Sequence, residues 1–347
     1  MSIRIQLQIT ALIIAGVVLA NCSTTKQQTA PLLPYVENSK VGFIDSTLKT
    51  QIPPQFKFLP DRNWPYTFSE GFTAFNVLGR VGYLDTGGRL AIEPQFDAAY
   101  NFSNGLARVQ QNGKYGYIDH AGNYAVEPRF YDAGDFRGGL APVQLDKHGR
   151  WGFINKKGEF VIKPRFLDAK PFSDGRARVQ TAAHREWGYI DRSGEFVIPA
   201  QFPEAADFSE GLAAVQLEFK QFGYIDIHGR VVIESQYLKA GPFSEGLAPV
   251  AMPDSPDNLE TYSYGYIDRS GRFVVEPVYD RAFAFHNGVA RVKSGNRFGY
   301  IDKRGRAIIE PIFDYAWDFR GGLGLVKTDN KFAYINNKGL FALEPNN

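Results

Sequence analysis

The sequence predicts an all-β fold built from tandem copies of one small unit. A four-residue motif recurs along most of the chain, with a period that is typical of repeat architectures. The 347 residues include 28 Phe, 18 Tyr and 4 Trp, together with 35 Gly and 20 Pro. Aromatic residues favour strands, and frequent Gly and Pro favour tight turns between short strands.

The recurring motif is Gly-aromatic-Ile-Asp, and Gly116-Tyr117-Ile118-Asp119 is a clean copy. Successive copies start 40, 34, 36, 36, 35, 42, 34 and 34 residues apart. The other copies begin at Gly42, Gly82, Gly152, Gly188, Gly223, Gly265, Gly299 and, in degenerate form, Ala333. This spacing predicts about eight or nine units of about 34–36 residues over residues 41–347.

Each unit is expected to be a three-stranded antiparallel meander. In the copy from Phe102 to Phe136, the strands are predicted at residues 106–110, 115–119 and 124–127. Asp119 and Gly122 stand at the first and fourth positions of a tight turn that joins the last two strands. Pro128 is expected to end the third strand, because proline has no N–H for the ladder.

The residues that recur in every unit are interpreted as structural. Gly116 is expected to permit close approach of neighbouring backbone or of an aromatic ring, and the aromatic residue before it to join the core. The position of Arg108 varies between copies, which favours a solvent-exposed site. The same structural role is predicted for the motif glycines Gly152, Gly188, Gly223, Gly265 and Gly299.

These units resemble the WG repeat, a family of bacterial β-repeats named for its Trp-Gly pair (also written WG/KWG). Trp151-Gly152 and Trp187-Gly188 match the name literally, and other copies have Tyr, Phe or Val before the glycine. The resemblance covers about residues 41–345. It implies a bacterial β-repeat scaffold and no particular activity.

Two arrangements fit such an array, an open curved solenoid or superhelix and a closed β-propeller. Closure usually divides one unit between the two ends of a chain. Here the first copy, at residues 41–56, and the last, at residues 332–345, both contain the second and third strands. The duplicated ends favour the open solenoid, with the propeller as the alternative.

The N-terminal residues predict export. Residues 1–22 combine an early Arg4 with an apolar run at residues 9–20, which is the length of a signal-peptide core. Leu19-Ala20-Asn21-Cys22 resembles a bacterial lipobox, and Cys22 is the single cysteine of the chain. We expect lipid attachment at Cys22 and a polar tether over residues 23–40.

The residue after the cysteine, Ser23, favours the outer membrane as the destination. Cleavage after Ala20, which would give a soluble periplasmic or secreted protein, is the alternative.

No catalytic, metal or cofactor site is predicted. The net charge of +2 and the even spread of Lys and Arg argue against nucleic acid as a partner. The five histidines are far apart in sequence and are interpreted as surface residues: His120, His148, His184, His228 and His286. Copy-specific insertions at residues 252–263 and 57–65, the second with Trp64, are expected to be loops.

The sequence therefore favours a non-enzymatic, lipid-anchored envelope protein whose repeat surface binds a protein or peptide. The alternative is a surface protein that binds or hydrolyses glycans. That alternative predicts an exposed aromatic cluster or two carboxylates about 5–10 Å apart in a cleft.

Overall fold

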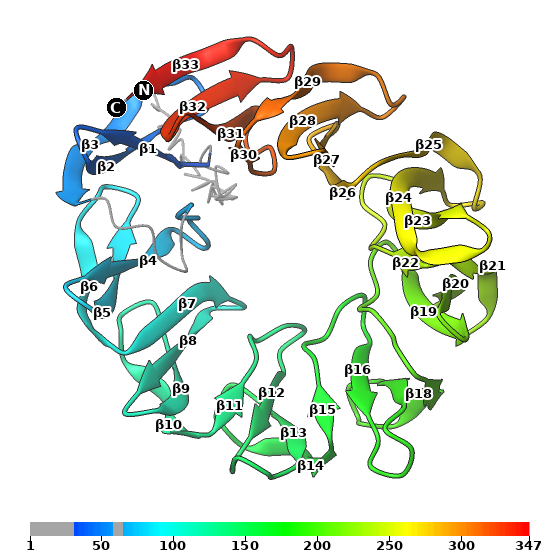
Figure 1. Ribbon diagram of the computed structural model, residues 1–347. Helices are drawn as coiled ribbons and strands as arrows, with labels where there is room; N and C mark the ends of the chain where they lie inside the picture. The colour runs from blue at the N-terminus through cyan, green and yellow to red at the C-terminus, as the bar shows by residue number, and fades with distance from the viewer. Residues whose placement is uncertain (1–30, 58–64, 347) are drawn as a thin grey trace, which may run out of the picture.

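The structure is a computed structural model that describes residues 31–57 and 65–346. These residues form nine separate antiparallel sheets and no helix (Figure 1). The sheets follow one another around a central opening, as the blades of a propeller do, and we number them 1 to 9 along the chain. The described part of the chain contains no helix long and apolar enough to cross a membrane.

The prediction of an all-β tandem repeat is confirmed, and the array is the closed β-propeller rather than the favoured open solenoid. Blade 9 packs on blade 1 through a cluster that includes Leu323, Tyr334, Leu33 and Ile44. The Tyr334 hydroxyl donates to the carbonyl of Pro34 at 2.7 Å. No strand is shared between the ends, because each end supplies a complete blade. The duplicated terminal copies therefore do not oppose closure.

The strands within each blade are consecutive in sequence. Blade 1 contains β1 (Leu33–Glu37), β2 (Lys40–Ile44) and β3 (Thr50–Lys57), and blade 2 contains β4 (Phe72–Val77), β5 (Arg80–Asp85) and β6 (Leu90–Phe96). Blade 3 contains β7 (Ala98–Ser103), β8 (Leu106–Gln111), β9 (Lys114–Ile118) and β10 (Tyr124–Phe130). Blade 4 contains β11 (Asp132–Ala133), β12 (Ala141–Gln144), β13 (Trp151–Ile154) and β14 (Phe160–Phe166). Blade 5 contains β15 (Asp168–Ala169), β16 (Ala177–Gln180), β17 (Trp187–Ile190) and β18 (Phe196–Phe202). Blade 6 contains β19 (Leu212–Glu218), β20 (Gln221–Asp226) and β21 (Val231–Tyr237). Blade 7 contains β22 (Lys239–Ala240), β23 (Leu247–Ser255), β24 (Asn258–Asp268) and β25 (Phe273–Tyr279). Blade 8 contains β26 (Arg281–His286), β27 (Val289–Ser294), β28 (Arg297–Asp302) and β29 (Ala307–Phe313). Blade 9 contains β30 (Tyr315–Ala316), β31 (Leu323–Thr328), β32 (Lys331–Asn336) and β33 (Phe341–Asn346).

Six blades have a fourth, inner strand that the three-stranded prediction missed. It is often two residues long, as in β11, and it pairs with the first strand of the meander on the side of the central opening (Figure 1). The sequence before each Phe looked irregular because so short a strand leaves no alternation of polar and apolar residues.

The motif glycine lies where the outer strand crosses directly over the second strand. A Cβ on Gly116 would lie 2.6 Å from the Val126 carbonyl oxygen and 2.7 Å from the Pro128 nitrogen. The outer strand bulges here, since Val126 pairs with Tyr117 but Phe130 is the next to pair, with Tyr115. Pro128 therefore lies inside β10 and does not end it. A proline fits because its nitrogen points at the glycine and needs no partner there.

The one copy that has alanine in place of this glycine has a smaller bulge. In blade 9, Tyr334 pairs with Leu343 and Phe332 pairs with Asn346, three residues later rather than four. The backbone of β33 is thereby shifted along β32, and Ala333 fits with 1% exposure.

The hairpin turn of each blade has the geometry that its sequence suggests. The Asp119 side chain accepts hydrogen bonds at 2.9 Å from the backbone N–H groups of Ala121 and Asn123. Gly122 has φ of 84°, a left-handed conformation that favours glycine. We call the side of the ring that carries these turns the turn face, and the side with the hairpins between first and second strands the hairpin face.

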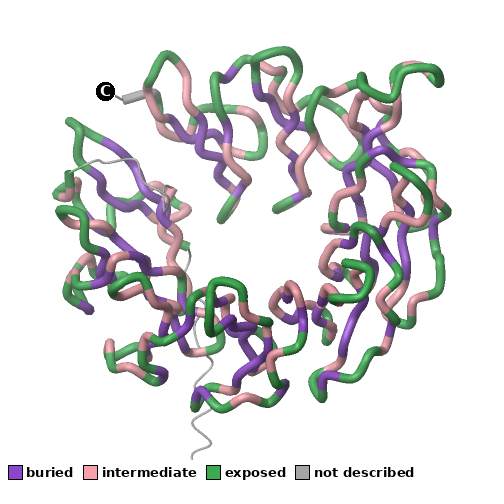
Figure 2. Tube along the Cα trace, turned by 60° about the horizontal axis from the view of Figure 1, so that its bottom comes forward, coloured by how far each residue is buried: buried purple, intermediate pink, exposed green. Residues whose placement is uncertain are grey.

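Adjacent blades meet at seams with one repeated design. In the seam between blades 3 and 4, Tyr117 is buried against Phe136 of the next blade, with ring centroids 4.7 Å apart. The Tyr117 hydroxyl donates to the Gly134 carbonyl at 2.7 Å, and burial raises the pKa of this tyrosine well above its usual range. Buried residues accordingly run through the middle of the blades, while exposed residues lie at the two faces (Figure 2).

Serines on the turn face join the seams a second time. The hydroxyls of Ser69, Ser103, Ser173, Ser209 and Ser244 each donate at 2.7 Å to the carbonyl of the Phe in the next blade. Such partly buried hydrogen bonds between neighbours, together with the buried aromatic pairs, explain how units too small to fold alone form a stable ring.

The described structure also changes two expected boundaries. The first blade begins at Leu33, so part of the tether expected over residues 23–40 belongs to β1, whose residues Leu33, Tyr35 and Val36 are buried. The insertion at residues 252–263 extends the hairpin of β23 and β24 rather than forming a loop. Cys22 and Trp64 lie outside the described residues.

Candidate functional site

The inner wall of the ring is built from one short segment per blade, with the pattern Ala-x-x-Phe. Ala133-Gly134-Asp135-Phe136 is the copy in blade 4. We call these the inner segments. The residue after the Ala varies most between them, and in blades 3 to 9 it is Tyr100, Gly134, Lys170, Ala206, Gly241, Phe283 and Trp317. The inner wall is therefore one part of the ring in which the blades differ.

At three seams, an arginine of one blade holds the inner segment of the next. The Arg178 guanidinium donates to the Asp207 carboxylate at 2.6 Å and also to the carbonyl of Ala205. The corresponding nitrogen–oxygen distances are 3.2 Å for Arg108 and Asp135 and 3.3 Å for Arg291 and Asp318. The Arg178 contact is a charge-assisted hydrogen bond, whereas the other two are ion pairs whose facing nitrogen and oxygen atoms make no hydrogen bond.

The prediction that the position of Arg108 faces solvent was wrong. The Arg108 side chain is 15% exposed and stacks over Tyr100 at 3.8 Å, and the Arg291 side chain is 10% exposed. A signal for these pairs was present in the sequence, because Asp follows Arg after 27, 29 and 27 residues. Where the first strand has Ala74, Pro142, Ala214 or Pro249, the next inner segment has Asn101, Pro171, Pro242 or Ala284 in place of Asp.

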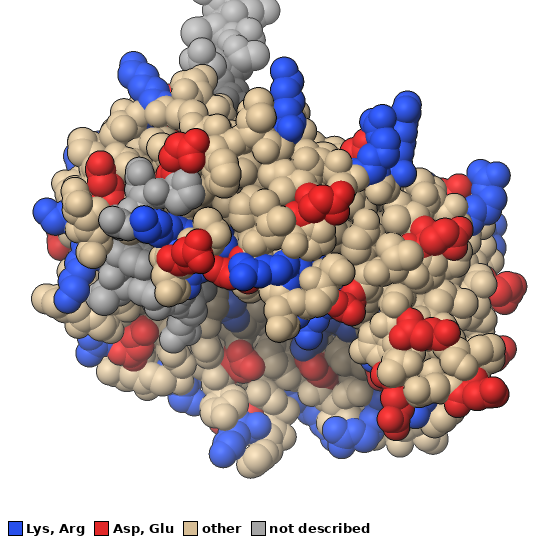
Figure 3. All heavy atoms as spheres, turned by 45° about the horizontal axis from the view of Figure 1, so that its top comes forward, with Lys and Arg blue, Asp and Glu red and all other residues tan. Residues whose placement is uncertain are grey.

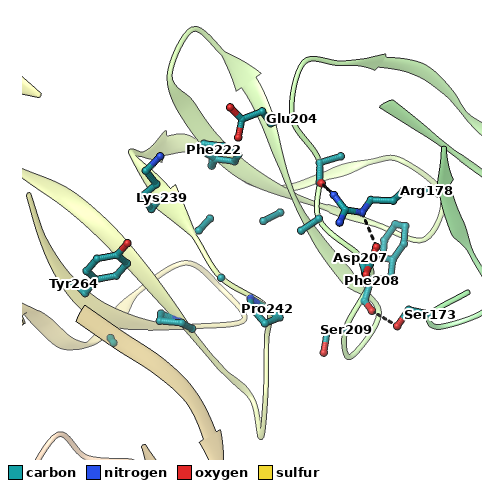
Figure 4. A pocket seen from close by; sticks show the side chains of 17 residues that line it. Ser173, Arg178, Glu204, Asp207, Phe208, Ser209, Phe222, Lys239, Pro242 and Tyr264 are labelled. Atoms are coloured by element: carbon teal, nitrogen blue, oxygen red, sulfur yellow. Dashed lines mark hydrogen bonds and ion pairs between the residues drawn. The ribbon is translucent and has the colours of Figure 1, made fainter. Parts of the chain in front are cut away.

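A pocket of 690 Å³ opens in the inner wall at blades 5 to 8, and we call it the hollow (Figure 4). Its floor consists of small residues at positions that hold large ones in other blades. Ala206 and Gly241 replace the aromatic residues Phe283 and Trp317 of blades 8 and 9. The other small lining residues are Ala205, Ala214, Ala240, Pro242, Pro249 and Ala282.

Polar groups line the hollow at its rim. Glu204 and Lys239 occupy the same position in neighbouring inner segments, and both are exposed. Phe222 and Tyr264 add partly buried aromatic surface, and burial raises the pKa of Tyr264. Of the carboxylates in the lining, Asp207 is held by Arg178. The arrangement offers an apolar floor with one cationic and one anionic group, and suits a ligand with polar ends and a small apolar middle.

The residues predicted as structural do not line the hollow. Gly116, Gly152, Gly188, Gly265 and Gly299 lie under the outer strands of their blades, as does Gly223 of the blade that contributes Phe222. Asp119 and Gly122 lie in turns on the turn face.

The histidines likewise do not converge. His120 contacts the Glu70 carboxylate at 2.9 Å and stacks on Phe72, and His286 lies 3.8 Å from Asp318. His148, His184 and His228 are exposed. Within residues 31–57 and 65–346, no group of three or more His, Cys, Asp or Glu residues is placed to hold a metal ion.

Charges of both signs are interspersed over the face seen in Figure 3. The extended hairpin of blade 7 has an acidic tip, with Asp254, Asp257 and Glu260 exposed. The mixed charges therefore create no broad field of one sign over this face.

The comparisons with known proteins address the family and the fold. The family described as "WG containing repeat" matches the chain seven times, at residues 82–115, 115–147, 151–181, 187–218, 222–252, 264–297 and 298–332. No match was found among curated proteins.

Solved structures with similar folds include the crystal structure of the eukaryotic initiation factor. It has a TM-score of 0.63 at 13% identity and covers 91% of this chain and 96% of that one. BamB from Moraxella catarrhalis has a TM-score of 0.49 at 13% identity, covering 82% and 96%. Hsv2p from Kluyveromyces lactis has a TM-score of 0.43 at 8% identity, covering 71% and 95%. At 13% identity the first likeness shows a common fold and nothing of function.

Proposed function

Since the chain belongs to the WG-repeat family and closes into a propeller, we propose that it is a non-enzymatic scaffold that binds a segment of another protein. We place this binding at the hollow in blades 5 to 8. The proposal includes export and attachment of the scaffold to the bacterial envelope through Cys22.

The observation that carries this proposal is the hollow itself, where Ala206 and Gly241 stand at positions that hold Phe283 and Trp317 in blades 8 and 9. A floor of Ala, Gly and Pro lets the backbone of an extended ligand approach closely. The volume of 690 Å³ falls within the ~300–1,000 Å³ range of ligand pockets. Lys239 and Glu204 supply one charge of each sign for the polar groups of a peptide.

The alternative of glycan hydrolysis gains no specific support at the hollow. Hydrolysis needs two carboxylates that act on one bond, and Asp207 is occupied by Arg178. The proposal of a protein ligand does not need either carboxylate to be reactive.

The position of the first described residues supports an orientation for the anchored protein. Pro31 lies beside Gly321 on the turn face, near blade 9. The eight residues 23–30 span at most about 29 Å when fully extended, at about 3.6 Å per residue. An anchor at Cys22 therefore holds the turn face toward the membrane and leaves the hairpin face toward partners.

A filling substitution tests the binding site. Ala206→Trp introduces at the hollow the residue that blade 9 has as Trp317, so the repeat already accommodates it. We expect this variant to lose crosslinks from a photoreactive group at Lys239 to its partner in intact cells. Tyr100→Trp, at the same repeat position in blade 3, is the matched control and should keep them. Unchanged crosslinking in Ala206→Trp would reject the hollow as the site.

A second experiment tests the anchor. Growth with a fatty-acid analogue should label the wild-type protein, and the Cys22→Ala variant should lose the label. Equal labelling of the two proteins contradicts lipid attachment at this residue.

A further inference from the structure

Within the part of the chain that the structure describes, eight of the nine seams contain a phenylalanine from an inner segment, and the seam between blades 9 and 1 contains none. In the eight filled seams, this Phe packs on the second-strand aromatic of the preceding blade with centroids 4.7–5.4 Å apart. In the seam that closes the ring, the corresponding cluster has Leu323, Tyr334, Leu33, Tyr35 and Ile44 but neither the Ala nor the Phe of an inner segment.

The sequence explains this difference. Pro34 pairs with Phe43 as Arg108 pairs with Tyr117, so Pro34 marks the equivalent position in blade 1. In blades 2 to 9, the Phe of the inner segment stands six residues before this position, and seven of these eight segments have Ala nine residues before it. Counting back from Pro34 gives residues 25–28, which read Thr-Lys-Gln-Gln. The closing seam has no Ala-x-x-Phe sequence of its own.

A mostly apolar pocket of 100 Å³ lies at this seam, and we call it the closing-seam pocket. Its apolar lining comes from blade 9, from Leu33 of blade 1 and from Tyr66 of blade 2, and the charged residues Arg291, Asp318 and Arg320 also line it. The residues of blade 9 that supply apolar surface are Trp317, Leu323, Leu325 and Tyr334. A cavity of about 150 Å³ lined by aliphatic and aromatic residues is sufficient for benzene. At 100 Å³ the closing-seam pocket has about two-thirds of that volume, so it encloses a phenyl ring in part and leaves the remainder of the ring exposed to solvent.

The backbone around the pocket also departs from the other seams. In blade 4, the Pro142 carbonyl accepts a hydrogen bond at 2.8 Å from the Gly134 N–H of the inner segment. In blade 1, the equivalent Pro34 carbonyl accepts from the Tyr334 hydroxyl instead. On the turn face, the Arg320 guanidinium contacts the Thr67 hydroxyl and so links blade 9 directly to blade 2.

We propose that the closing-seam pocket binds an extended Ala-x-x-Phe segment of a partner protein, with its phenyl ring packed against Tyr334. The sequence of the proposed ligand is inferred from the other seams of the ring. Seven of them are filled by an Ala-x-x-Phe segment, and an eighth is filled by Pro65-Tyr66-Thr67-Phe68. A folded second copy of the chain does not supply it. Its inner-segment Phe residues Phe102, Phe136, Phe172, Phe208, Phe243, Phe285 and Phe319 are buried in their own seams.

This site is separate from the hollow and depends on the proposed function only in that the occupant is a protein. Burying a Phe side chain contributes about 1.5–3 kcal/mol, or roughly 10- to 100-fold in affinity. Most of the specificity should therefore depend on that one side chain, while backbone hydrogen bonds along the inner edge of β1 orient the segment.

A peptide taken from the chain itself tests this proposal. Fluorescein-labelled peptide with the sequence of residues 131–139 contains Ala133-Gly134-Asp135-Phe136, and its binding to the full-length protein in detergent is measured by fluorescence anisotropy. We expect saturable one-to-one binding, and at least about tenfold weaker binding of the same peptide with Phe136→Ala. In the protein, Leu325→Phe should fill the pocket and abolish binding.

Matched variants separate this site from the hollow. Ala206→Trp fills the hollow and should leave peptide affinity unchanged, even if it abolishes the crosslinks described above. The thermal midpoint of each variant shows whether it is folded, and the peptide variant needs no change in the protein. Equal affinity of the two peptides, undiminished binding by folded Leu325→Phe, or no binding at millimolar peptide would each overturn the proposal.

Discussion

The seam between blades 3 and 4 and the seam between blades 9 and 1 perform the same task with different parts. In the first, Ala133 and Phe136 of the inner segment fill the space beside Tyr117. In the second, Tyr334 bonds directly to β1, and Arg320 reaches past blade 1 to Thr67. The ring thus closes through side-chain packing and side-chain hydrogen bonds, and within the described residues its closing seam lacks the inner segment that completes the others.

This difference teaches where such a ring is open to change. Eight seams are self-sufficient, because the inner segment of each following blade completes them. The ninth is incomplete within the described residues, and the small closing-seam pocket lies beside it. Stability and binding capacity are therefore distributed unevenly around a molecule whose repeats look alike.

Emptying a filled seam should have the largest effect. Phe136→Ala removes the ring that packs on Tyr117 and should lower the free energy of unfolding by about 3–5 kcal/mol. Leu325→Phe, which adds a ring to the closing seam, should cost less than about 1.5 kcal/mol or stabilise the protein. Urea unfolding of both variants measures this contrast. Similar losses in the two would show that the closing seam has no unfilled space.

The motif glycine gives the next largest contrast. A Cβ on Gly299 would lie 2.6 Å from the Ile309 carbonyl oxygen and 2.7 Å from the Pro311 nitrogen, so Gly299→Ala must displace β29. We expect this change to lower the free energy of unfolding by about 1–3 kcal/mol. Ala333→Gly, in the blade with the smaller bulge, should cost only about 0.5–1 kcal/mol. If the two changes cost the same, the bulge does not determine which residue fits.

Each tyrosine hydroxyl at a seam should contribute about 1 kcal/mol to the free energy of unfolding. Tyr117→Phe removes the bond to Gly134, and Tyr334→Phe removes the bond to Pro34. Phe153→Tyr in blade 4 adds a hydroxyl near the carbonyl of Lys170, which lies 17 residues later, the same separation as in the other seams. This change should raise the free energy of unfolding by up to about 1 kcal/mol. Thermal unfolding of the three variants checks the order. A loss on Phe153→Tyr would contradict equivalent seam geometry.

The smallest effect concerns acid. The Ser270 hydroxyl is the main group that lowers the pKa of Asp268, to about 2. Because the folded state binds the proton less readily than the unfolded state, Asp268 contributes stability above about pH 4, its ordinary range. This contribution is lost as the pH falls through about 2.

Asp268→Asn should therefore destabilise the protein slightly at pH 6 and hardly at all at pH 2. Blade 9 has Asn336 at this position, and Asn336→Asp should introduce a pH dependence of the same sign. Urea midpoints between pH 2 and 6 measure both. A difference for Asp268→Asn that persists at pH 2 would exclude the carboxylate as its source.

The sequence predicts the repeat, the turns and the close approach at the glycine because each depends on residues near one another in the chain. The Asp119 turn and the Gly116 contact are determined within one hairpin. The open solenoid was wrongly favoured over the closed propeller because closure depends on how Tyr334 meets Pro34, 300 residues away. The inner segments were missed because two paired residues such as Asp132 and Ala133 leave no periodic pattern.

The candidate sites could be predicted from the sequence in part. The spacing of Arg178 and Asp207, repeated in two other pairs, was readable from the sequence, and so was the missing Ala-x-x-Phe before blade 1. The hollow was not, because its floor combines Ala206 with Gly241 and Ala282 from three blades, and small residues give no signal until their neighbours are known.

The central claim, that the ring closes at one incomplete seam, is tested most directly by hydrogen exchange of backbone amides followed by mass spectrometry. Amides of β1 and β31 should exchange sooner than those of β8 and β12, and addition of the peptide of residues 131–139 should slow exchange in β1 selectively. Exchange in β1 as slow as in β8 and β12, and unaffected by the peptide, would contradict the account.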